Sequence, residues 1–460
     1  MSSHAERAPI NLPVFKEYQD FLHVQGRFAN GEGLRSFIAE VCEDSRQFAT
    51  GYRYHFDDTE GQQQIDVMNS WCSSDQGKKT IFDLTKETLR IISLCSKYSD
   101  NLLGGHDIHH FMQDVIGAMK ITDSENIHDY RELVLITSLL HDIGRSPEAL
   151  IRRNKKLGNE LGEEVRKNHA AISFYFARHL FKFFPIQPAI KNRMLHAILN
   201  HTGSPSGVSD ENFSLDDISN LTVSADRSDL TGADLILRVI SHEGGELGYL
   251  LSALSAKLNS TRVHSFGEND GKTSIFEIIE FCIRNLRPIY GETGERMAHD
   301  GKVIAGTFLY LGVPEKVRKV IFAPEIARDQ GRKLAVMPSK KILPENIWQE
   351  ILRESKKSEN KLITTDRGKI ELAVLLRGLI GKPGMTLTDE MLDQLYNKLL
   401  VLTPEERSAF TRGLRYIRAV QIEQTATNKF FLKMIINKYP ADSIQHLVAT
   451  QAINELEYIL

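Results

Sequence analysis

The pair His141-Asp142 stands at the end of an apolar run that includes Leu139 and Leu140. An apolar segment has no reason to carry an imidazole and a carboxylate inward together unless something there binds both. A divalent metal is the usual reason, because imidazole nitrogens and carboxylate oxygens replace the water molecules around the ion. The pair occurs by chance in many proteins, so a metal site is predicted only if further ligands lie elsewhere in the chain.

Further candidate ligands lie in helical segments before and after this pair. His169 shares a helical face with Ile172 and Phe176, so we expect its side chain to point inward. The alternative for His169 is a core histidine satisfied by a backbone carbonyl. His196, mid-helix, is better explained as a structural or surface residue. The polar residues of interest are His106, His109, His110, His141, Asp142, His169, His196, His201 and Asp226.

Helical periodicity dominates the chain and strict alternation is scarce, so the sequence predicts an all-α fold. We expect three parts: an N-terminal helical region over residues 1–98, a metal-binding region over 99–337 and a C-terminal helical domain over 338–460. A polar, Gln-rich loop is expected from Asp57 to Gln64, and a linker from Pro338 to Pro344. The segment Thr403-Pro404-Glu405-Glu406 predicts a capping box at the start of a C-terminal helix.

The amino-acid composition is that of a globular protein and argues against some classes of function. Of the 460 residues, 41% are hydrophobic and 25% charged, which is typical of a globular protein, and a net charge of -3 gives no strong nucleic-acid signal. No apolar run is long enough for a membrane span, and the polar first residues do not resemble a signal peptide. The four scattered cysteines suggest buried small side chains in a reducing compartment, so a cytoplasmic location is expected.

Taken in order, the His-Asp pair and the histidines and aspartate before and after it resemble the motifs of the HD-domain metal-dependent phosphohydrolases. The resemblance covers about residues 104–235 and is closest to the HD-GYP-like branch, in the stretch His141-Asp142-Ile143-Gly144-Arg145, Pro147, Leu157 and His169, and in Ala225-Asp226-Arg227-Ser228-Asp229-Leu230-Thr231. Two features depart from that branch. The segment that contains the GYP motif is absent, with Asn200-His201-Thr202-Gly203 in its place, and Arg145 replaces the usual lysine.

The resemblance implies an HD-domain helical bundle with additional N- and C-terminal helical regions. It implies that His110, His141, Asp142 and Asp226 bind one metal, while His169 and His201 bind a second that Asp142 bridges to the first. The segment around His106 and His110 also resembles the HNxxH motif of cyclic-nucleotide phosphodiesterases, which makes His106 a candidate acid for the leaving group. The expected cofactors are one or two divalent ions per chain, of Mn, Fe, Co, Ni, Zn or Mg.

This chemistry suits a phosphoester, whose negative charge repels hydroxide. Two cations about 3.5–4 Å apart screen that charge and produce a metal-activated hydroxide that attacks phosphorus. The expected catalytic residues are Asp142 as the bridging carboxylate, Arg145 as a clamp on phosphate oxygens and His106 as the proton donor. The expected substrate is a small phosphomonoester or phosphodiester, nucleotide-derived. The basic residues Arg152, Arg153, Lys155 and Lys156 form either an electropositive rim or a solvated helix face.

Two other classes of function stay open at this point. The first is a non-catalytic signalling or binding module on the same HD scaffold. The second is a host-directed or partner-docking protein, in which the C-terminal helices contact a protein partner or a second copy of the chain. The segment from Gly267 to Thr273 resembles a phosphate-binding loop but is one residue too short, so a solvent turn is expected there.

Overall fold

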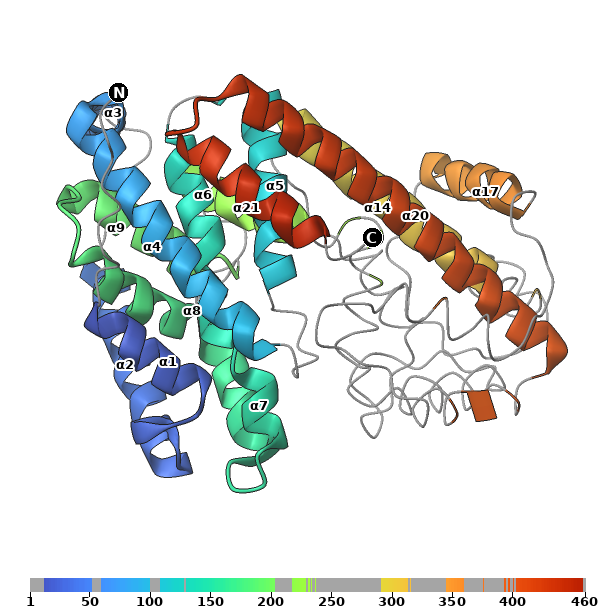
Figure 1. Ribbon diagram of the computed structural model, residues 1–460, viewed down its shortest axis with the longest axis horizontal. Coiled ribbons are helices and arrows are strands. Elements are labelled where there is room, and N and C mark those ends of the chain that lie inside the picture. The colour runs from blue at the N-terminus through green and yellow to red at the C-terminus, as the bar shows by residue number, and fades with distance from the viewer. Residues whose placement is uncertain are drawn as a thin grey trace. The chain divides into compact units, whose positions relative to one another are not determined.

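The computed structural model describes residues 12–51, 59–99, 108–127, 130–202, 217–228, 291–312, 345–359 and 403–457, with single positions between 231 and 400. Within these residues all regular structure is helical, which confirms the all-α prediction (Figure 1). Contacts divide the chain into two compact units, residues 1–223 with 441–448, and residues 224–440 with 449–460. Helices α10 and α21 each cross this division, and the three-domain boundaries expected above remain a prediction.

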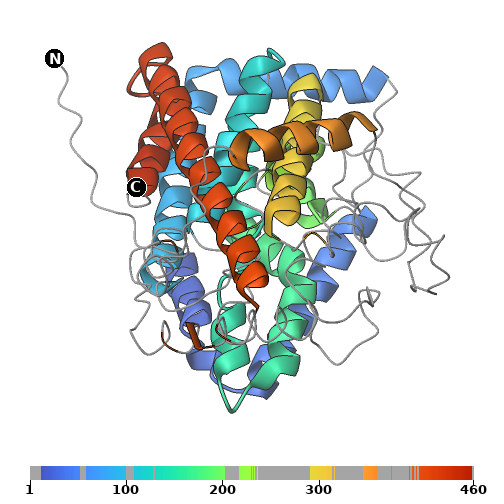
Figure 2. The same cartoon turned by 90° about the vertical axis from the view of Figure 1, so that its right-hand side faces the viewer.

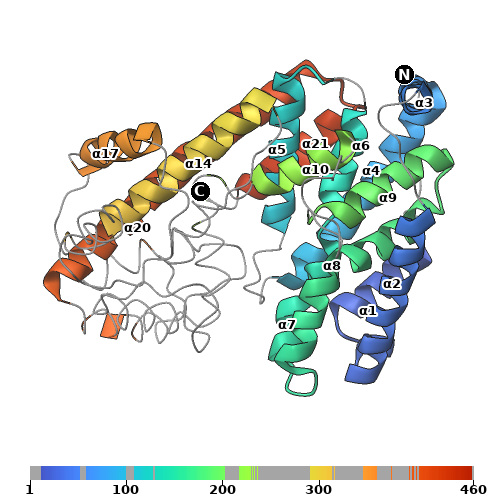
Figure 3. The same cartoon turned by 180° about the vertical axis from the view of Figure 1, so that it is seen from behind.

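The first unit is a helical bundle whose centre is the long helix α8. Helix α8 packs against α2, α7, α9 and the short helix η2, while α6 packs against α4, α5 and α9 (Figure 3). The helices are α1 (Pro13–Leu22), η1 (Gly26–Phe28), α2 (Gly31–Gly51), α3 (Thr59–Ser73), α4 (Asp75–Ser99), α5 (Ile108–Ser124), α6 (Arg131–Leu140), η2 (Ile143–Arg145), α7 (Glu148–Arg153), α8 (Gly158–Phe181), α9 (Pro188–Asn200) and α10 (Asp217–Ser228).

The Gln-rich segment is not a loop throughout, as the sequence analysis expected. Residues 59–64 form the first turns of α3. Glutamine and glutamate are good helix formers, and the long helix that follows outweighs the cost of Gly61. Residues 57 and 58 lie outside the described residues.

The N-terminal helices pack directly on the segment that follows His141. The Tyr18 hydroxyl on α1 is fully buried and donates a hydrogen bond of 2.9 Å to the backbone oxygen of Ile143 in η2. The ring of Tyr18 also contacts the ring of Phe176 on α8, with centroids 4.8 Å apart. Helix α1 therefore contributes to fixing the turn after the His-Asp pair, although it lies more than a hundred residues away in the sequence.

The second unit contains α14 (Gly291–Gly312), α17 (Glu345–Glu359) and α20 (Pro404–Lys438), and α21 (Ile444–Glu457) ends in it. Helix α14 packs against both α17 and α20, and α17 lies across it (Figure 2). The packing is close at Gly306, where a Cβ atom would lie 2.3 Å from Ile351 Cδ1. The predicted capping box is confirmed, since Thr403 Oγ1 accepts from Glu406 N and Glu406 Oε2 accepts from Thr403 N. None of the described helices is long and apolar enough to cross a membrane.

Candidate metal centre

Helix α6 brings the His-Asp pair into the interior. Every residue from Leu133 to Leu140 is buried, so this helix is enclosed on all sides and its C-terminal end lies within the bundle. His141 follows as the helix C-cap and has no exposed surface, and Asp142 is 2% exposed. The apolar run therefore delivers both polar side chains to the core, as the sequence predicted.

Three histidines of the first unit are oriented in the same way. In His141, His169 and His201, the Nδ1 atom faces the backbone oxygen three residues earlier, at 2.8, 2.6 and 2.7 Å. A carbonyl oxygen can only accept, so each Nδ1 carries the proton and donates. In a neutral imidazole the Nε2 atom then presents its lone pair, which is the form that binds metals.

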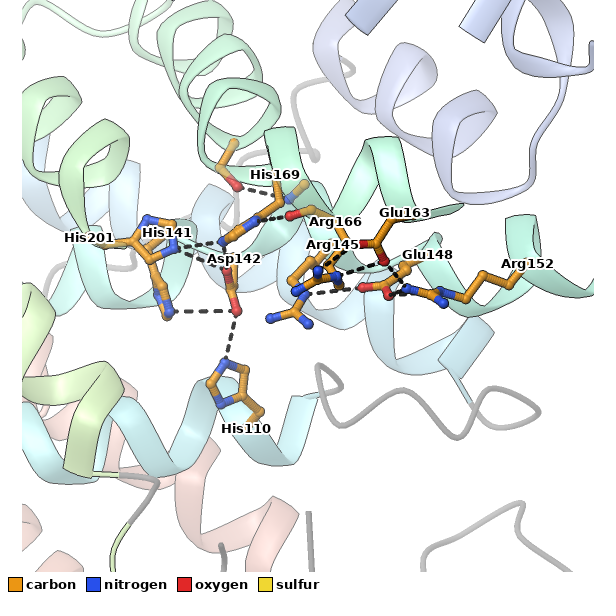
Figure 4. Close-up of polar contacts among 12 residues, drawn as sticks. His110, His141, Asp142, Arg145, Glu148, Arg152, Glu163, Arg166, His169 and His201 are labelled. Carbon is orange, nitrogen blue, oxygen red and sulfur yellow. Dashed lines mark hydrogen bonds and ion pairs between the residues drawn. The ribbon is translucent and has the colours of Figure 1, made fainter. Parts of the chain in front are cut away.

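These lone pairs converge on Asp142 (Figure 4). Asp142 Oδ1 lies 3.0 Å from His169 Nε2 and 3.2 Å from His201 Nε2, and the two Nε2 atoms are 3.0 Å apart. All three side chains are buried. Three acceptor atoms so close together repel one another unless a cation lies among them, so this geometry fits a metal ion.

A second group of ligand atoms surrounds the other oxygen of Asp142. His110 Nε2 lies 3.2 Å from Asp142 Oδ2 and 3.4 Å from Asp114 Oδ2, and His141 Nε2 lies 3.7 Å from Asp114 Oδ2. One ligand atom from each of His110, Asp114 and His141 lies within 4.8 Å of the others, as is also true of His141, Asp142 and His201. Asp142 thus faces two potential metal positions, one with each oxygen.

Asp114 was not predicted as a ligand from the sequence motifs. This side chain has no exposed surface and lies one helical turn after His110 on α5, so both point to the same side of the helix. The spacing of four residues was the available signal. A lone aspartate at that spacing in a helix is common on solvated faces, so the signal depends on knowing which face is buried.

Burial affects the protonation of this site. Burial lowers the pKa of His201 below its ordinary value, and this outweighs the attraction of the Asp142 carboxylate for a protonated imidazole, which raises the pKa. The His201 imidazole is therefore neutral at neutral pH, and a neutral imidazole can bind a metal without first losing a proton.

Arg145 lies beside the cluster and is held by an acidic neighbour. Its Nε atom donates to Glu148 Oε2 at 3.1 Å, and Glu148 also accepts from Arg152 Nε at 2.9 Å. The guanidinium group of Arg145 lies between Glu148 and the side on which Asp142 and His110 lie (Figure 4). Glu148 is 6% exposed, so its charge is compensated by the two arginines rather than by water.

The basic residues that follow Arg145 do not all have the same environment. Arg152 pairs with Glu148 and Glu163, both at 2.8 Å, so its charge is compensated. Lys155 and Lys156 are exposed to solvent, and the side chain of Arg153 lies outside the described residues. For Arg152 this pairing favours a structural role over an electropositive rim.

Gly144 permits the close packing of η2 on α8. A Cβ atom there would lie 2.4 Å from the His169 backbone oxygen and 2.9 Å from Ser173 N. Its own backbone N–H donates to Ser173 Oγ at 2.9 Å. The absence of a side chain at Gly144 therefore keeps Asp142 and His169, on adjacent elements, within reach of one another.

Asp226 is half-buried on α10, one turn after Thr222, whose hydroxyl lies 2.7 Å from that of Thr137 on α6. His106 lies outside the described residues, as do the linker from Pro338 to Pro344 and the segment from Gly267 to Thr273. His196 is half-buried, and its Nδ1 atom lies 3.3 Å from Ser219 Oγ.

The side chains of two of the four cysteines lie within the described residues. Cys42 and Cys72 are in the thiol form, and each is half-buried rather than buried as the sequence predicted. Cys42 lies on α2 and its Sγ donates to Asn168 Oδ1 on α8 at 3.2 Å, so it has a polar neighbour as well as apolar ones.

The comparison with protein families gives one result, in which residues 108–236 match the HD domain. The matched segment begins at α5 and includes His110, Asp114, the His-Asp pair, His169, His201 and Asp226. No curated protein and no solved structure matches the chain. HD domains are generally metal-dependent hydrolases, and the buried histidines and aspartates described above can hold a divalent ion. The chain therefore carries an HD domain over residues 108–236.

Proposed function

We propose that the protein is a metal-dependent phosphohydrolase that acts on a phosphomonoester or phosphodiester derived from a nucleotide. The observation that carries this proposal is the convergence of the Nε2 lone pairs of His169 and His201 on Asp142 Oδ1. A structural histidine cluster would point N–H groups at the carboxylate. Here the protons are on the far side of the rings, facing carbonyl oxygens.

The residues fit two divalent ions. In this proposal His110, His141, Asp142 and Asp226 hold the first ion, and His169, His201 and Asp142 hold the second. The position of Asp226 on α10 supports its inclusion, because it shares a helical face with Thr222, which contacts α6. When bound, such ions lower the pKa of water and neutralise charge on a phosphate group.

Other residues of the chain bind and orient the substrate. The terminal nitrogens of Arg145 are the candidate contacts for phosphate oxygens, since its Nε atom is taken by Glu148. Glu148 holds the guanidinium on the side of Asp142, so a phosphate group bound there lies next to the cluster. The protonation of the leaving group by His106 remains a prediction from the motif.

The first experiment compares the wild type with a His141→Ala, Asp142→Ala double variant. Both proteins are purified without added metal, and their metal content and hydrolysis of mono- and bis-(p-nitrophenyl) phosphate are measured. We expect at least one equivalent of transition metal in the wild type and none in the variant, with turnover reduced to background. His196→Ala is the control, because His196 is a histidine on α9 that contacts Ser219 and lies outside the cluster.

Equal turnover in the double variant and the wild type would reject the proposal. A wild type that carries no metal and hydrolyses neither ester would instead favour a binding module on the same scaffold. A panel of mononucleotides, cyclic nucleotides and cyclic dinucleotides then identifies the substrate class. Addition of a chelator should abolish turnover, and Mn²⁺, Fe²⁺ or Zn²⁺ should restore it.

A further inference from the structure

We infer that Asp114 is a ligand of the metal bound by His110 and His141, a role that the sequence motifs do not give it. This inference rests on the proposed metal site. Its first basis is position, since the Asp114 carboxylate has no exposed surface, and its Oδ2 atom lies 3.4 and 3.7 Å from the Nε2 atoms of these two histidines.

The chemistry of the facing atoms indicates a cation between them. His141 Nδ1 donates to the Ser138 backbone oxygen, so its Nε2 atom offers a lone pair toward Asp114. A carboxylate oxygen also offers only lone pairs. Two acceptors at this separation in a buried site are stable together when a positive ion binds both of them.

A simple ion pair between Asp114 and a protonated His110 accounts for less of this geometry. The Nε2 atom of His110 faces Asp142 Oδ2 at 3.2 Å as well as Asp114 at 3.4 Å. One N–H group makes one well-directed hydrogen bond, whereas a metal attracts all its ligands at once. The ion pair also leaves the approach of His141 to Asp114 unexplained.

Asp114 makes the two metal positions chemically unequal. The first position has the carboxylates of Asp114 and Asp142 beside its two histidines, whereas the second has His169 and His201 around the shared Asp142. Carboxylates suit Mn²⁺ and Mg²⁺, while imidazoles suit Zn²⁺, Fe²⁺ and Ni²⁺. We therefore expect Mn²⁺ to prefer the first position over the second.

The test is the Asp114→Asn variant, which keeps the shape of the side chain and removes its charge. Mn²⁺ affinity is measured on metal-free protein in competition with a chelator. We expect a loss of more than about 100-fold, since losing a partner outside the ligand shell costs about 10- to 100-fold. One equivalent of Zn²⁺ should still bind, because the second position does not use Asp114.

Thermal unfolding of the same proteins separates a ligand role from a structural role of Asp114. The two roles change the unfolding temperature of the metal-free variant in opposite directions. If Asp114 is a ligand, the metal-free variant unfolds at the same temperature as the wild type or higher, because a buried negative charge beside Asp142 is gone. Mn²⁺ then stabilises the variant less than it stabilises the wild type. Thr122→Val is the control, because this buried α5 hydroxyl bonds within its own helix, to the Ala118 and Met119 oxygens.

Two results would overturn the inference. The first is a Mn²⁺ affinity reduced by less than about 100-fold, together with a metal-free variant that is less stable than the wild type. The second, which needs no variant, is a crystal structure of the Mn²⁺-loaded wild type with the nearest Asp114 oxygen well beyond the usual metal–oxygen distance of about 2.2 Å. A wild type that binds no metal would reject the proposed function itself, which separates the two failures.

Discussion

Two polar clusters in the first unit differ in how their charges and hydrogen-bonding groups are balanced. The cluster formed by Glu17, Arg27 and Tyr175 contains its own cation. Arg27 Nη2 contacts Glu17 Oε1 at 2.5 Å and Tyr175 Oη at 3.1 Å, and Tyr175 donates to Glu17 at 3.0 Å. Donors and acceptors therefore match within the cluster. In the metal cluster, the atoms of Asp142, His169 and His201 that face one another are all acceptors.

This difference separates a structural cluster from a ligand site. The guanidinium of Arg27 also lies over the ring of Phe37, 4.6 Å from its centroid, so the cation is held by apolar as well as charged neighbours. Such a cluster is complete without a ligand and links α1, η1 and α8. The cluster around Asp142 requires a positive ion from outside the chain to reach the same balance. Substitutions in either cluster test this difference.

The largest effect is expected from His169→Ala, compared with His179→Ala on the same helix. Both imidazoles use Nδ1 to contact a backbone oxygen, but His169 Nε2 faces Asp142 while His179 packs on Tyr175. We expect His169→Ala to lower turnover of an aryl phosphate ester by more than about 100-fold and to lower metal content. His179→Ala should leave both unchanged. Similar losses in the two variants would show that the orientation of Nε2 does not decide function.

A smaller effect, on stability and metal affinity together, is expected from Gly144→Ala. The added Cβ atom meets the backbone of His169 and Ser173, which cannot move without shifting α8. We expect a loss of about 1–3 kcal/mol in the free energy of unfolding of the metal-free protein, measured with urea. Metal affinity should fall as well, because Asp142 and His169 move apart. Gly158→Ala is not a suitable control, since Gly158 has a positive φ of 79°. Gly51→Ala is suitable, since an added Cβ atom there has no neighbour within 4 Å among the described residues beyond the adjoining ones.

Removing the cation of the structural cluster should affect stability alone. In Arg27→Met the apolar stem is kept, but the contacts with Glu17 and Tyr175 are lost. The Arg27 side chain is 39% exposed, which weakens its ion pairs, so we expect a loss of about 1–2 kcal/mol in the free energy of unfolding. Metal content and turnover should equal those of the wild type. A loss of metal in this variant would contradict the separation of the two clusters.

The smallest effect is expected at alkaline pH. Burial and the neighbouring charge of Glu17 raise the pKa of Tyr175 to about 12. Between pH 10 and 12 the unfolded chain therefore loses the phenol proton while the folded protein keeps it, so stability falls as the pH rises. Tyr175→Phe should lack this part of the decline. The measurement is the difference in unfolding free energy between the two proteins at pH 9 and pH 11, and a difference that does not change would contradict the raised pKa.

The helical fold was predictable because periodic apolar residues leave one buried face per helix, and α1 and α2 follow that pattern closely. The Gln-rich segment before residue 65 was predicted wrongly, since its polarity was given more weight than its helix propensity. The inward direction of His169 was predicted correctly from its apolar neighbours. The hydrogen bond from His169 to a backbone carbonyl was the alternative to metal binding at the level of the sequence. The two are compatible, because the carbonyl engages Nδ1 and leaves Nε2 for a metal.

The amino-acid sequence by itself determined which elements form and which motif residues they carry, because helix periodicity and motif spacing are local properties. Only the tertiary structure showed that Asp114 faces His141 and that Tyr18 supports the turn after the His-Asp pair. These contacts join residues on different helices. They depend on how α1, α5, α6 and α8 pack, and packing is decided by the shapes of many side chains acting together, which no single segment encodes.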